Sequence, residues 1–317
     1  MSISSDPDRL AVLVPCHNEA EAIAKVVADF RAALPAARII VFDNASTDDT
    51  TARAAAAGAE VRSVSLRGKG NVVRRMFADI DADVYVLVDG DDTYDAASAP
   101  KMVHKLLAEG LDMAVGARIP VGSAAYRPGH VLGNRLLTGF LSRLFGRNFT
   151  DILSGYRVFS RRFVKSFPVF SAGFEIETEL AVHALEMSMP VGEMETPYRE
   201  RPAGTSSKLK TYRDGARILF TILRLYSIER PIGFYGSIAL TLALGAIGLA
   251  IPIFRTYLAT GLVPRFPTAI LATGVMLLAT LSFLAGIILA TVTRGRQELK
   301  ALIYLQHAAP ESVARSS

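Results

Sequence analysis

Two long runs without a charged residue lie near the C-terminus of this 317-residue chain, at positions 232–254 and 268–293. They contain 23 and 26 residues, and as α-helices they would reach roughly 34 and 39 Å. A bilayer's hydrocarbon core is about 30 Å thick, so either run is long enough to cross it. Two buried core helices are the alternative, but soluble helices rarely continue so far without a charge. The sequence therefore predicts two membrane-spanning helices.

Basic residues flank both runs. Residues 199–230 carry eight Lys or Arg against three Asp or Glu, directly before the first run. Such flanks suit an anionic cytoplasmic leaflet and favour a hairpin with both ends in the cytoplasm. We therefore expect a multi-pass protein of the inner (cytoplasmic) membrane, with a hairpin over 231–294 and a cytoplasmic tail over 295–317. Three basic residues follow the second run: Arg294, Arg296 and Lys300.

Two further observations bear on this topology. Arg255 and Arg265 lie in the short connection between the runs, which weakens the orientation argument. The first nine residues are polar and do not resemble a signal peptide, so we expect the N-terminal part to stay in the cytoplasm. The basic residues adjoin a membrane segment and no recognition motif accompanies them, so no nucleic-acid partner is expected.

The first 120 residues alternate two patterns. Short apolar segments rich in Val and Ile alternate with longer segments of helical periodicity. This alternation is typical of a largely parallel sheet covered by helices, so the expected fold class is α/β. The expected strands lie at 10–16, 38–42, 61–66, 84–88 and 113–117, and the expected helices at 19–34, 48–57, 71–80 and 99–109.

The pattern is less regular beyond residue 129. It predicts a strand at 191–198, a polar loop at 201–210 and an amphipathic helix that lies in the membrane interface at 214–230. Helices are expected at 130–145 and 174–187, with a polar turn at 150–155 between them.

Polar residues cluster directly after three of the expected strands, at 15–19, 43–49 and 89–92. Ligands of open α/β sheets bind beyond the carboxyl ends of the strands, so these clusters mark the expected site. The third cluster holds three carboxylates within four residues, Asp89-Gly90-Asp91-Asp92. Like charges that close repel unless a cation offsets them, and Mg²⁺ or Mn²⁺ prefers such oxygen ligands. Strand alternation sends Asp89 and Asp91 to the same side, so these two are the candidate metal ligands.

Several motifs occur in order along residues 10–210. They are Val12-Leu13-Val14-Pro15-Cys16-His17-Asn18-Glu19, the segment 41–50, Arg67-Gly68-Lys69-Gly70-Asn71 and the Asp89–Asp92 cluster. Together they resemble the family-2 nucleotide-sugar glycosyltransferases, whose GT-A fold is Rossmann-like. The later motifs are similar to those of the polyprenyl-phosphate and dolichyl-phosphate sugar synthases.

The resemblance implies a nucleotide-sugar site at matching positions. Asp89 and Asp91 would serve the metal and the diphosphate, with Gly90 between them. A carboxylate such as Asp43 can accept hydrogen bonds from a base N–H or a sugar hydroxyl. The other residues implied to line the nucleotide site are Pro15, His17, Glu19, Val41 and Lys69. Ser46 or Thr47 is also expected to cap the helix that follows.

The same resemblance implies a phosphate-binding acceptor side. Arg118 ends an expected strand, Arg135 opens an expected helix, and Arg201 and Lys208 lie in the polar loop. Arginine forms bidentate bonds to phosphate oxygens and lysine supplies a point charge, which suits this role. We name Asp89, Asp91, Arg118 and Arg135 as candidate catalytic residues.

These inferences give one working interpretation. A GT-A domain at 1–212, an amphipathic segment at 213–230 and the hairpin would transfer a sugar from a UDP- or GDP-linked donor to polyprenyl phosphate. Transfer would use Mg²⁺ or Mn²⁺ and invert the anomeric centre, for cell-envelope glycan or glycoprotein synthesis. The sugar, the nucleotide, the polyprenol length and a homo-oligomeric state stay open.

Two alternatives remain. The first is a family-2 transferase that acts on another lipid or glycan acceptor; the absence of Trp argues against the processive synthases. The second is a non-catalytic membrane scaffold, against which the intact Asp89 and Asp91 argue.

Overall fold

The computed structural model describes residues 9–120, 139, 150–173, 175–199, 219–220, 223–224 and 226–310. The chain forms two compact units, here called the sheet unit and the hairpin unit. The sheet unit comprises Met1–Ile218 together with Lys300–Ser317, and the hairpin unit comprises Leu219–Leu299. The expected loop at 201–210 lies outside the described residues, and of the expected helix at 130–145 only residue 139 is described. Of the expected segment 214–230, residues 219–220, 223–224 and 226–230 are described.

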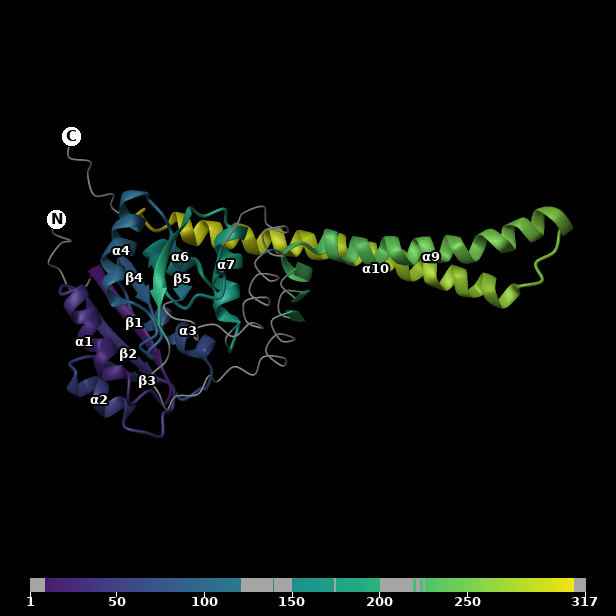
Figure 1. The fold of residues 1–317 in the computed structure, drawn as a ribbon. Coiled ribbons are helices and arrows are strands. Elements are labelled where there is room, and N and C mark those ends of the chain that lie inside the picture. Colours follow the sequence, from purple (N-terminus) through teal and green to yellow (C-terminus); the bar gives the residue numbers. More distant parts are fainter. Residues whose placement is uncertain are drawn as a thin grey trace. The chain divides into compact units, whose positions relative to one another are not determined.

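A sheet forms the centre of the sheet unit (Figure 1). It has seven strands, in the order β3-β2-β1-β4-β6-β5-β7. β1 pairs parallel with β2 and β4, β2 with β3, and β5 with β7, whereas β6 runs antiparallel to both of its neighbours. The mostly parallel sheet confirms the predicted fold class. The strands are β1 (Leu10–Cys16), β2 (Arg38–Asp43), β3 (Glu60–Ser63), β4 (Val84–Leu87), β5 (Met113–Pro120), β6 (Arg157–Ser160) and β7 (Val191–Tyr198).

Helices cover the sheet and explain why its central strands are so apolar. Every residue of β1 except Pro15 is buried, because a strand covered on both faces needs no polar face. α1 buries Ile23, Val26, Val27 and Phe30, the spacing of one helix face. The helices of this unit are α1 (Ile23–Ala33), α2 (Thr50–Ala56), α3 (Lys69–Asp79), η2 (Ala96–Ser98), α4 (Ala99–Ala108), α6 (Arg161–Ser166) and α7 (Ile176–Glu186).

The structure corrects two local expectations. β6, Arg157–Ser160, was not predicted from the sequence, because four residues are too few to show a period. The cap of α2 was predicted at Ser46 or Thr47, but the helix begins at Thr50 and its N-cap position is Asp49. Ser46 instead contacts the end of β1, where its Oγ accepts a hydrogen bond from Asn18 N at 2.9 Å.

Register brings the strand ends together at one edge of the sheet. Cys16 of β1 is aligned with Asp43 of β2, and β4 continues this edge because Val88 N donates to Leu13 O. β6 is antiparallel, so it begins where β4 ends, with Leu87 opposite Arg157. The turn before Arg157 therefore lies beside the carboxylates that follow β4.

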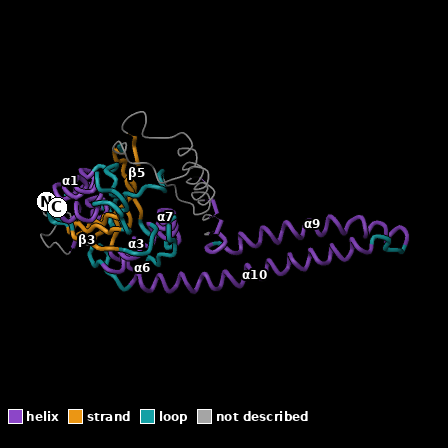
Figure 2. The backbone as a smooth tube through the Cα atoms, turned by 90° about the horizontal axis from the view of Figure 1, so that it is seen from below, coloured by secondary structure: helices purple, strands orange, loops and turns teal. Residues whose placement is uncertain are grey.

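The hairpin unit contains most of two long helices, α9 (Pro231–Thr260, 30 residues) and α10 (Phe266–Leu305, 40 residues). Both helices are long and apolar enough to span a membrane. The two helices lie side by side (Figure 2), and Ser282 Oγ donates to Tyr235 O at 3.2 Å. Each helix buries small side chains that recur every seven residues, so they lie on one face of the helix. Small side chains let two helix backbones approach closely. These residues are Ala239 and Ala246 on α9, and Ala272, Ala279, Gly286 and Thr293 on α10.

The last turns of α10 belong to the sheet unit. Lys300 Nζ lies 2.7 Å from Glu186 Oε2 at the end of α7, and Tyr304 donates to Asp112 Oδ2 at 2.7 Å. The guanidinium of Arg162 lies 4.7 Å from the centre of the Tyr304 ring. The helix therefore continues past residue 294, where the sequence placed the end of the hairpin.

Candidate active site

The first part of the site is formed by the ends of β1 and β2. Asp43 is the last residue of β2 and is buried. Its Oδ2 accepts from Ser46 N at 3.2 Å, whereas its buried Oδ1 has no hydrogen-bond partner among the described residues. An orphaned buried carboxylate oxygen is costly unless a ligand supplies a donor. Asp43 is therefore poised to accept from an N–H or O–H that the protein itself does not provide.

The other residues expected at the nucleotide site differ in how far they are buried. Pro15 and His17 are partly exposed at the end of β1, and Glu19 is buried beside the start of α1. The Glu19 backbone N–H donates to Thr50 Oγ1 at 2.9 Å, which ties this turn to α2. Val41 has no exposed surface and belongs to the hydrophobic core beneath the strand ends.

The carboxylates after β4 have separate environments. Asp91 is buried, and its Oδ1 accepts from Thr93 Oγ1 at 2.6 Å. The side chain of Asp89 is 28% exposed, and its Oδ1 lies 2.5 Å from Lys69 Nζ. Asp92 has a positive φ of 58° and pairs with Lys25 of α1 at 2.7 Å. Asp92 is thus engaged with α1, whereas Asp89 and Asp91 stay within the strand-end cluster.

Two glycines let this segment pack closely. A Cβ on Gly90 would overlap the sulfur of Cys16, and one on Gly155 would overlap the Asp89 carboxylate. Burial and then the surrounding carboxylates, with Glu19 first among them, raise the pKa of the Cys16 thiol, so it stays protonated. The close contact with Gly155 holds the Asp89 carboxylate against the 150–155 turn, and a larger residue at position 155 would overlap that carboxylate.

Lys69, the first residue of α3, bridges two carboxylates. Its Nζ lies 2.5 Å from Asp89 Oδ1 and 2.6 Å from Glu177 Oε1 of α7. Burial alone lowers the pKa of Lys69, but the two carboxylates outweigh burial and raise the pKa well above its ordinary value. Lys69 is therefore an ammonium fixed within the cluster.

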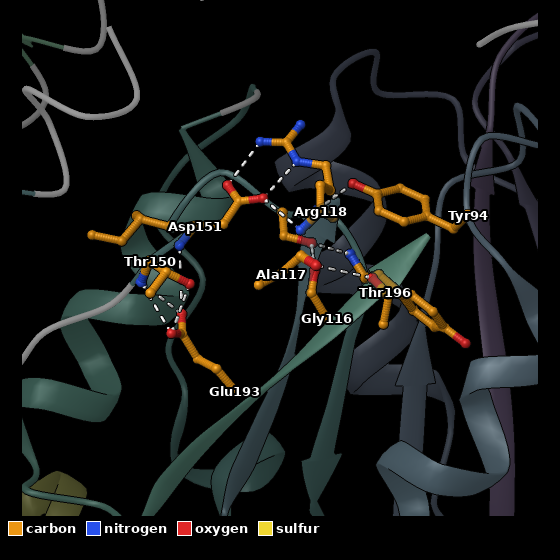
Figure 3. Close-up of polar contacts among 12 residues, drawn as sticks. Tyr94, Gly116, Ala117, Arg118, Thr150, Asp151, Glu193 and Thr196 are labelled. Atoms are coloured by element: carbon orange, nitrogen blue, oxygen red, sulfur yellow. Dashed lines mark hydrogen bonds and ion pairs between the residues drawn. The ribbon is translucent and has the colours of Figure 1, made fainter. Parts of the chain in front are cut away.

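Arg118 of β5 provides the second basic group and contacts the 150–155 turn (Figure 3). Its Nε and Nη2 donate to the two oxygens of Asp151 at 2.7 and 2.8 Å. Its guanidinium also lies 5.4 Å from the centre of the Tyr198 ring. The backbone N–H of Thr150 donates to Glu193 of β7, which fixes the start of the turn. An arginine with this planar two-point geometry has the form that also suits a phosphate.

Arg157 and Tyr94 shape the turn from inside the core. Arg157 is fully buried and donates to the carbonyl oxygens of Ser154 and Ile152. Burial lowers the pKa of Arg157 to about 10, so it is still charged at neutral pH. The hydroxyl of Tyr94 accepts from Gly155 N at 2.8 Å. These contacts hold the backbone of the turn in place.

The structure thus brings Asp43, Lys69, Asp89, Asp91 and Arg118 to one edge of one sheet. Arg135, Arg201 and Lys208 lie outside the described residues. The sequence placed Asp151 in the polar turn at 150–155 and Glu177 in the helix expected at 174–187, but it did not predict their pairing with Arg118 and Lys69, nor a role for Glu193. Glu177 is 108 residues from Lys69 along the chain, so no local pattern indicates that pair.

The carboxylates fit a divalent cation only if other ligands share it. No group of three or more His, Cys, Asp or Glu within the described parts of the chain is arranged to hold a metal. Mg²⁺ commonly binds through one or two carboxylates and the phosphates of a substrate. Asp89 and Asp91 supply the carboxylates of a donor set of that kind, which the phosphates of a substrate would complete.

Comparisons with known proteins point to one family. Residues 11–167 match the model of the family described as glycosyl transferase family 2. Glycosyltransferase AglJ of Haloferax volcanii is 37% identical over 251 residues, which cover 77% of this chain and 81% of AglJ. A dolichyl-phosphate hexose transferase of the same organism is 29% identical over 70% of this chain and 96% of its own length.

Solved structures share the fold. Glucosyl-3-phosphoglycerate synthase from Mycobacterium tuberculosis in complex with uridine diphosphate superposes with a TM-score of 0.55. It is 26% identical, and the match covers 69% of this chain and 79% of that one. The same synthase has been crystallised with Mg²⁺ and uridine diphosphate, and with Mn²⁺ and UDP-glucose. The family match, together with a relative that is similar over most of both chains, shows that this chain belongs to glycosyl transferase family 2.

Proposed function

We propose that this glycosyltransferase moves a sugar from a nucleoside-diphosphate sugar to a polyprenyl phosphate at a membrane surface. The observation that carries the proposal is the joint placement of two acidic and two basic side chains at one sheet edge. Asp89 and Asp91 suit a metal and a diphosphate, while Lys69 and Arg118 suit phosphate oxygens. The same chain carries two helices long enough to span a bilayer.

The sugar donor is held at the ends of β1 and β2. Asp43 would accept a hydrogen bond from the base or the ribose through the buried Oδ1 that has no partner among the described residues. Lys69 would contribute its ammonium to the diphosphate, beside the carboxylate of Asp89. A relative of this fold crystallised with uridine diphosphate supports a nucleotide at this edge.

Asp89 and Asp91 would hold Mg²⁺ or Mn²⁺, which supplies positive charge to the departing nucleoside diphosphate. The protein's own part is to fix the geometry. Packing against Gly155 sets the position of the Asp89 carboxylate, and the hydrogen bond from Thr93 Oγ1 orients that of Asp91.

Arg118 would bind the phosphate of the acceptor. A phosphate monoester has a second pKa of roughly 6, so its oxygen is already largely ionised at neutral pH. Attack on the anomeric carbon, with inversion, therefore needs no strong general base from the protein. The related dolichyl-phosphate hexose transferase supports a lipid phosphate as the acceptor class. Arg135, Arg201 and Lys208 are proposed to add charge on this side.

The membrane helices would keep the enzyme where its acceptor is. We propose that α9 and α10 span the inner membrane with the sheet unit and both termini in the cytoplasm. A nucleotide sugar is soluble in the cytoplasm, whereas a polyprenyl phosphate is confined to the bilayer. The product would be a lipid-linked monosaccharide for glycan or glycoprotein synthesis.

A donor screen tests the proposal. The full chain in liposomes that contain undecaprenyl phosphate is incubated with UDP- and GDP-linked sugars, with Mg²⁺, with Mn²⁺ or with EDTA. We expect one nucleotide sugar to give an inverted, phosphate-linked glycolipid only when a divalent cation is present. Transfer to a glycan or a different lipid, with none to undecaprenyl phosphate, would favour the alternative family-2 acceptor.

A further inference from the structure

Glu177 and Asp89 both contact the ammonium of Lys69. Glu177 lies in the first turn of α7, and its Oε1 is 2.6 Å from Lys69 Nζ, while Asp89 Oδ1 is 2.5 Å from the same nitrogen. The side chains of Lys69 and Glu177 are 9% and 8% exposed. Both charges are therefore largely withdrawn from water, and each depends on an oppositely charged partner for compensation.

The Lys69 ammonium contacts a carboxylate that a metal ion would also need, so the two cations compete for Asp89. Lys69 already neutralises Asp89, one of the two carboxylates proposed to bind the cation. Two positive groups cannot both keep full contact with the same carboxylate oxygen. If Asp89 turns to a divalent cation, Lys69 needs a second carboxylate that can take over its charge and its hydrogen bonds.

Glu177 has the capacity for this exchange. Its Oε2 is buried and has no hydrogen-bond partner among the described residues. An ammonium carries three donors, so Lys69 can bond both oxygens of Glu177 after it leaves Asp89. Within the cluster, Glu177 is the carboxylate that contacts Lys69 without being proposed to bind the metal.

The backbone around Glu177 is fixed relative to Lys69. The neighbouring carboxylate of Glu179 accepts from the backbone N–H groups of Phe170 and Ser171, at 2.9 and 2.8 Å. That loop in turn contacts the start of α3, where Gly70 N donates to Ala172 O at 3.1 Å. Because α3 and α7 are tied together, the long side chain of Lys69 is the part that can move.

We propose that Glu177 is a positioning residue that receives the Lys69 ammonium when Asp89 binds a divalent cation. Lys69 then stays beside the diphosphate without blocking the cation. This inference rests on the metal-dependent transfer proposed above. It assigns Glu177 a role in cation affinity through Lys69 and not through contact with the reacting atoms.

The test measures binding of Mn²⁺ alone to the full chain in detergent, by electron paramagnetic resonance of the free ion. Glu177→Gln removes the alternative partner of Lys69, so the ammonium is left on Asp89. We expect the dissociation constant for Mn²⁺ to rise by about tenfold. In the Lys69→Met background, where no ammonium competes, adding Glu177→Gln should change the Mn²⁺ affinity by less than about twofold.

The double variant separates this role from a simpler one. If Glu177 acted only through its negative charge, Glu177→Gln would weaken Mn²⁺ binding equally with and without Lys69, and the inference would be wrong. Should Glu177→Gln fail to fold, Lys69→Met alone decides: its Mn²⁺ affinity without nucleotide should equal or exceed that of wild type, and a loss overturns the inference.

The outcome also distinguishes this inference from the proposed function. If wild-type protein binds no Mn²⁺, or binds it with an affinity that Asp91→Asn does not alter, the result contradicts the metal-dependent reaction itself and the inference with it. Wild-type protein that binds Mn²⁺ with an affinity unchanged by Glu177→Gln contradicts only the role of Glu177.

Discussion

Asp89 and Asp91 belong to one motif but have different partners. Asp91 is buried and oriented by Thr93, whereas Asp89 shares its charge with Lys69. The neighbouring Asp92 pairs with Lys25 of α1. The three carboxylates are therefore distinguishable by substitution, although the sequence presents them as a single acidic cluster.

Asp91→Asn is expected to abolish turnover and keep the fold. An asparagine oxygen can still accept from Thr93 Oγ1, but the metal-binding charge is lost. The measurement is kcat in saturating Mg²⁺ or Mn²⁺, beside a melting curve. Asp92→Asn is the matched control, with the same change one residue later, and should keep most activity. Asp91→Asn activity within about threefold of wild type would remove Asp91 from the metal site.

Arg118→Ala should raise the KM for polyprenyl phosphate more than the KM for the nucleotide sugar. The loss of a charge-assisted hydrogen bond costs about 1.5–3 kcal/mol, which corresponds to roughly tenfold to a hundredfold. Arg75→Ala is the control, because Arg75 is exposed and pairs only locally with Asp79 on α3. Equal increases in both KM values would place Arg118 outside the acceptor site.

The sequence predicted positions in the site better than contacts. It placed Asp43, Lys69, Asp89 and Arg118 at strand or helix ends, because strand periodicity and turn chemistry are local. It did not predict the Lys69–Glu177 or Arg118–Asp151 pairs, since each joins distant segments. Their formation depends on how α7 and the 150–155 turn pack, which no single window of sequence records.

At the scale of elements, β6 and the end of α10 carry the main differences from expectation. β6 is only four residues long, yet its antiparallel insertion brings the 150–155 turn to the carboxylates. α10 continues to Leu305, where Lys300 and Tyr304 contact the sheet unit. Their partners Glu186 and Asp112 are 114 and 192 residues away, so no sequence pattern could indicate them.

Tyr304→Phe should destabilise the sheet unit by about 1 kcal/mol, because buried Asp112 loses one hydrogen bond and keeps those from Ser160 and Arg162. Cys16 gives a direct readout, since it is the chain's single cysteine and is buried until the unit unfolds. A thiol-reactive dye should therefore report a lower melting temperature. Tyr257→Phe, at an exposed tyrosine of α9, is the control. Equal melting temperatures for wild type and Tyr304→Phe would show that the contact adds no stability.

His183 of α7 makes the sheet unit sensitive to acid. Burial, together with the nearby Lys300 ammonium, lowers its pKa to about 3, against about 6.5 in an unfolded chain. Above pH 6.5 His183 is neutral in both states; as pH falls below that value the unfolded state gains the proton first, and stability is lost. The loss at pH 5 is about 2 kcal/mol.

The His183→Gln variant removes this titration. Its melting temperature should fall less between pH 7 and pH 5 than that of wild type. His104→Gln is the control, because His104 is an exposed residue of α4. An acid response in His183→Gln as large as in wild type would assign the pH dependence to other groups.

At the scale of the whole molecule, the distribution of apolar residues predicted two long C-terminal helices. Lipid imposes length and apolarity on a spanning helix, so the two uncharged runs anticipated α9 and α10. Alternating patterns anticipated the mostly parallel sheet for a similar reason, because covered strands must be apolar. The seam between α9 and α10 uses mainly alanine, at a spacing of seven, whereas Gly245, Gly248 and Gly274 have open space around them.

The central claim is that the acceptor is a lipid phosphate, and one comparison tests it most directly. The full chain in liposomes is supplied with its nucleotide sugar and Mg²⁺, and with either undecaprenyl phosphate or undecaprenol of the same chain length. We expect transfer to the phosphate only, with none above the Asp91→Asn background for the alcohol. Equal transfer to both lipids, or transfer to neither beside efficient glycosylation of another acceptor, would contradict it.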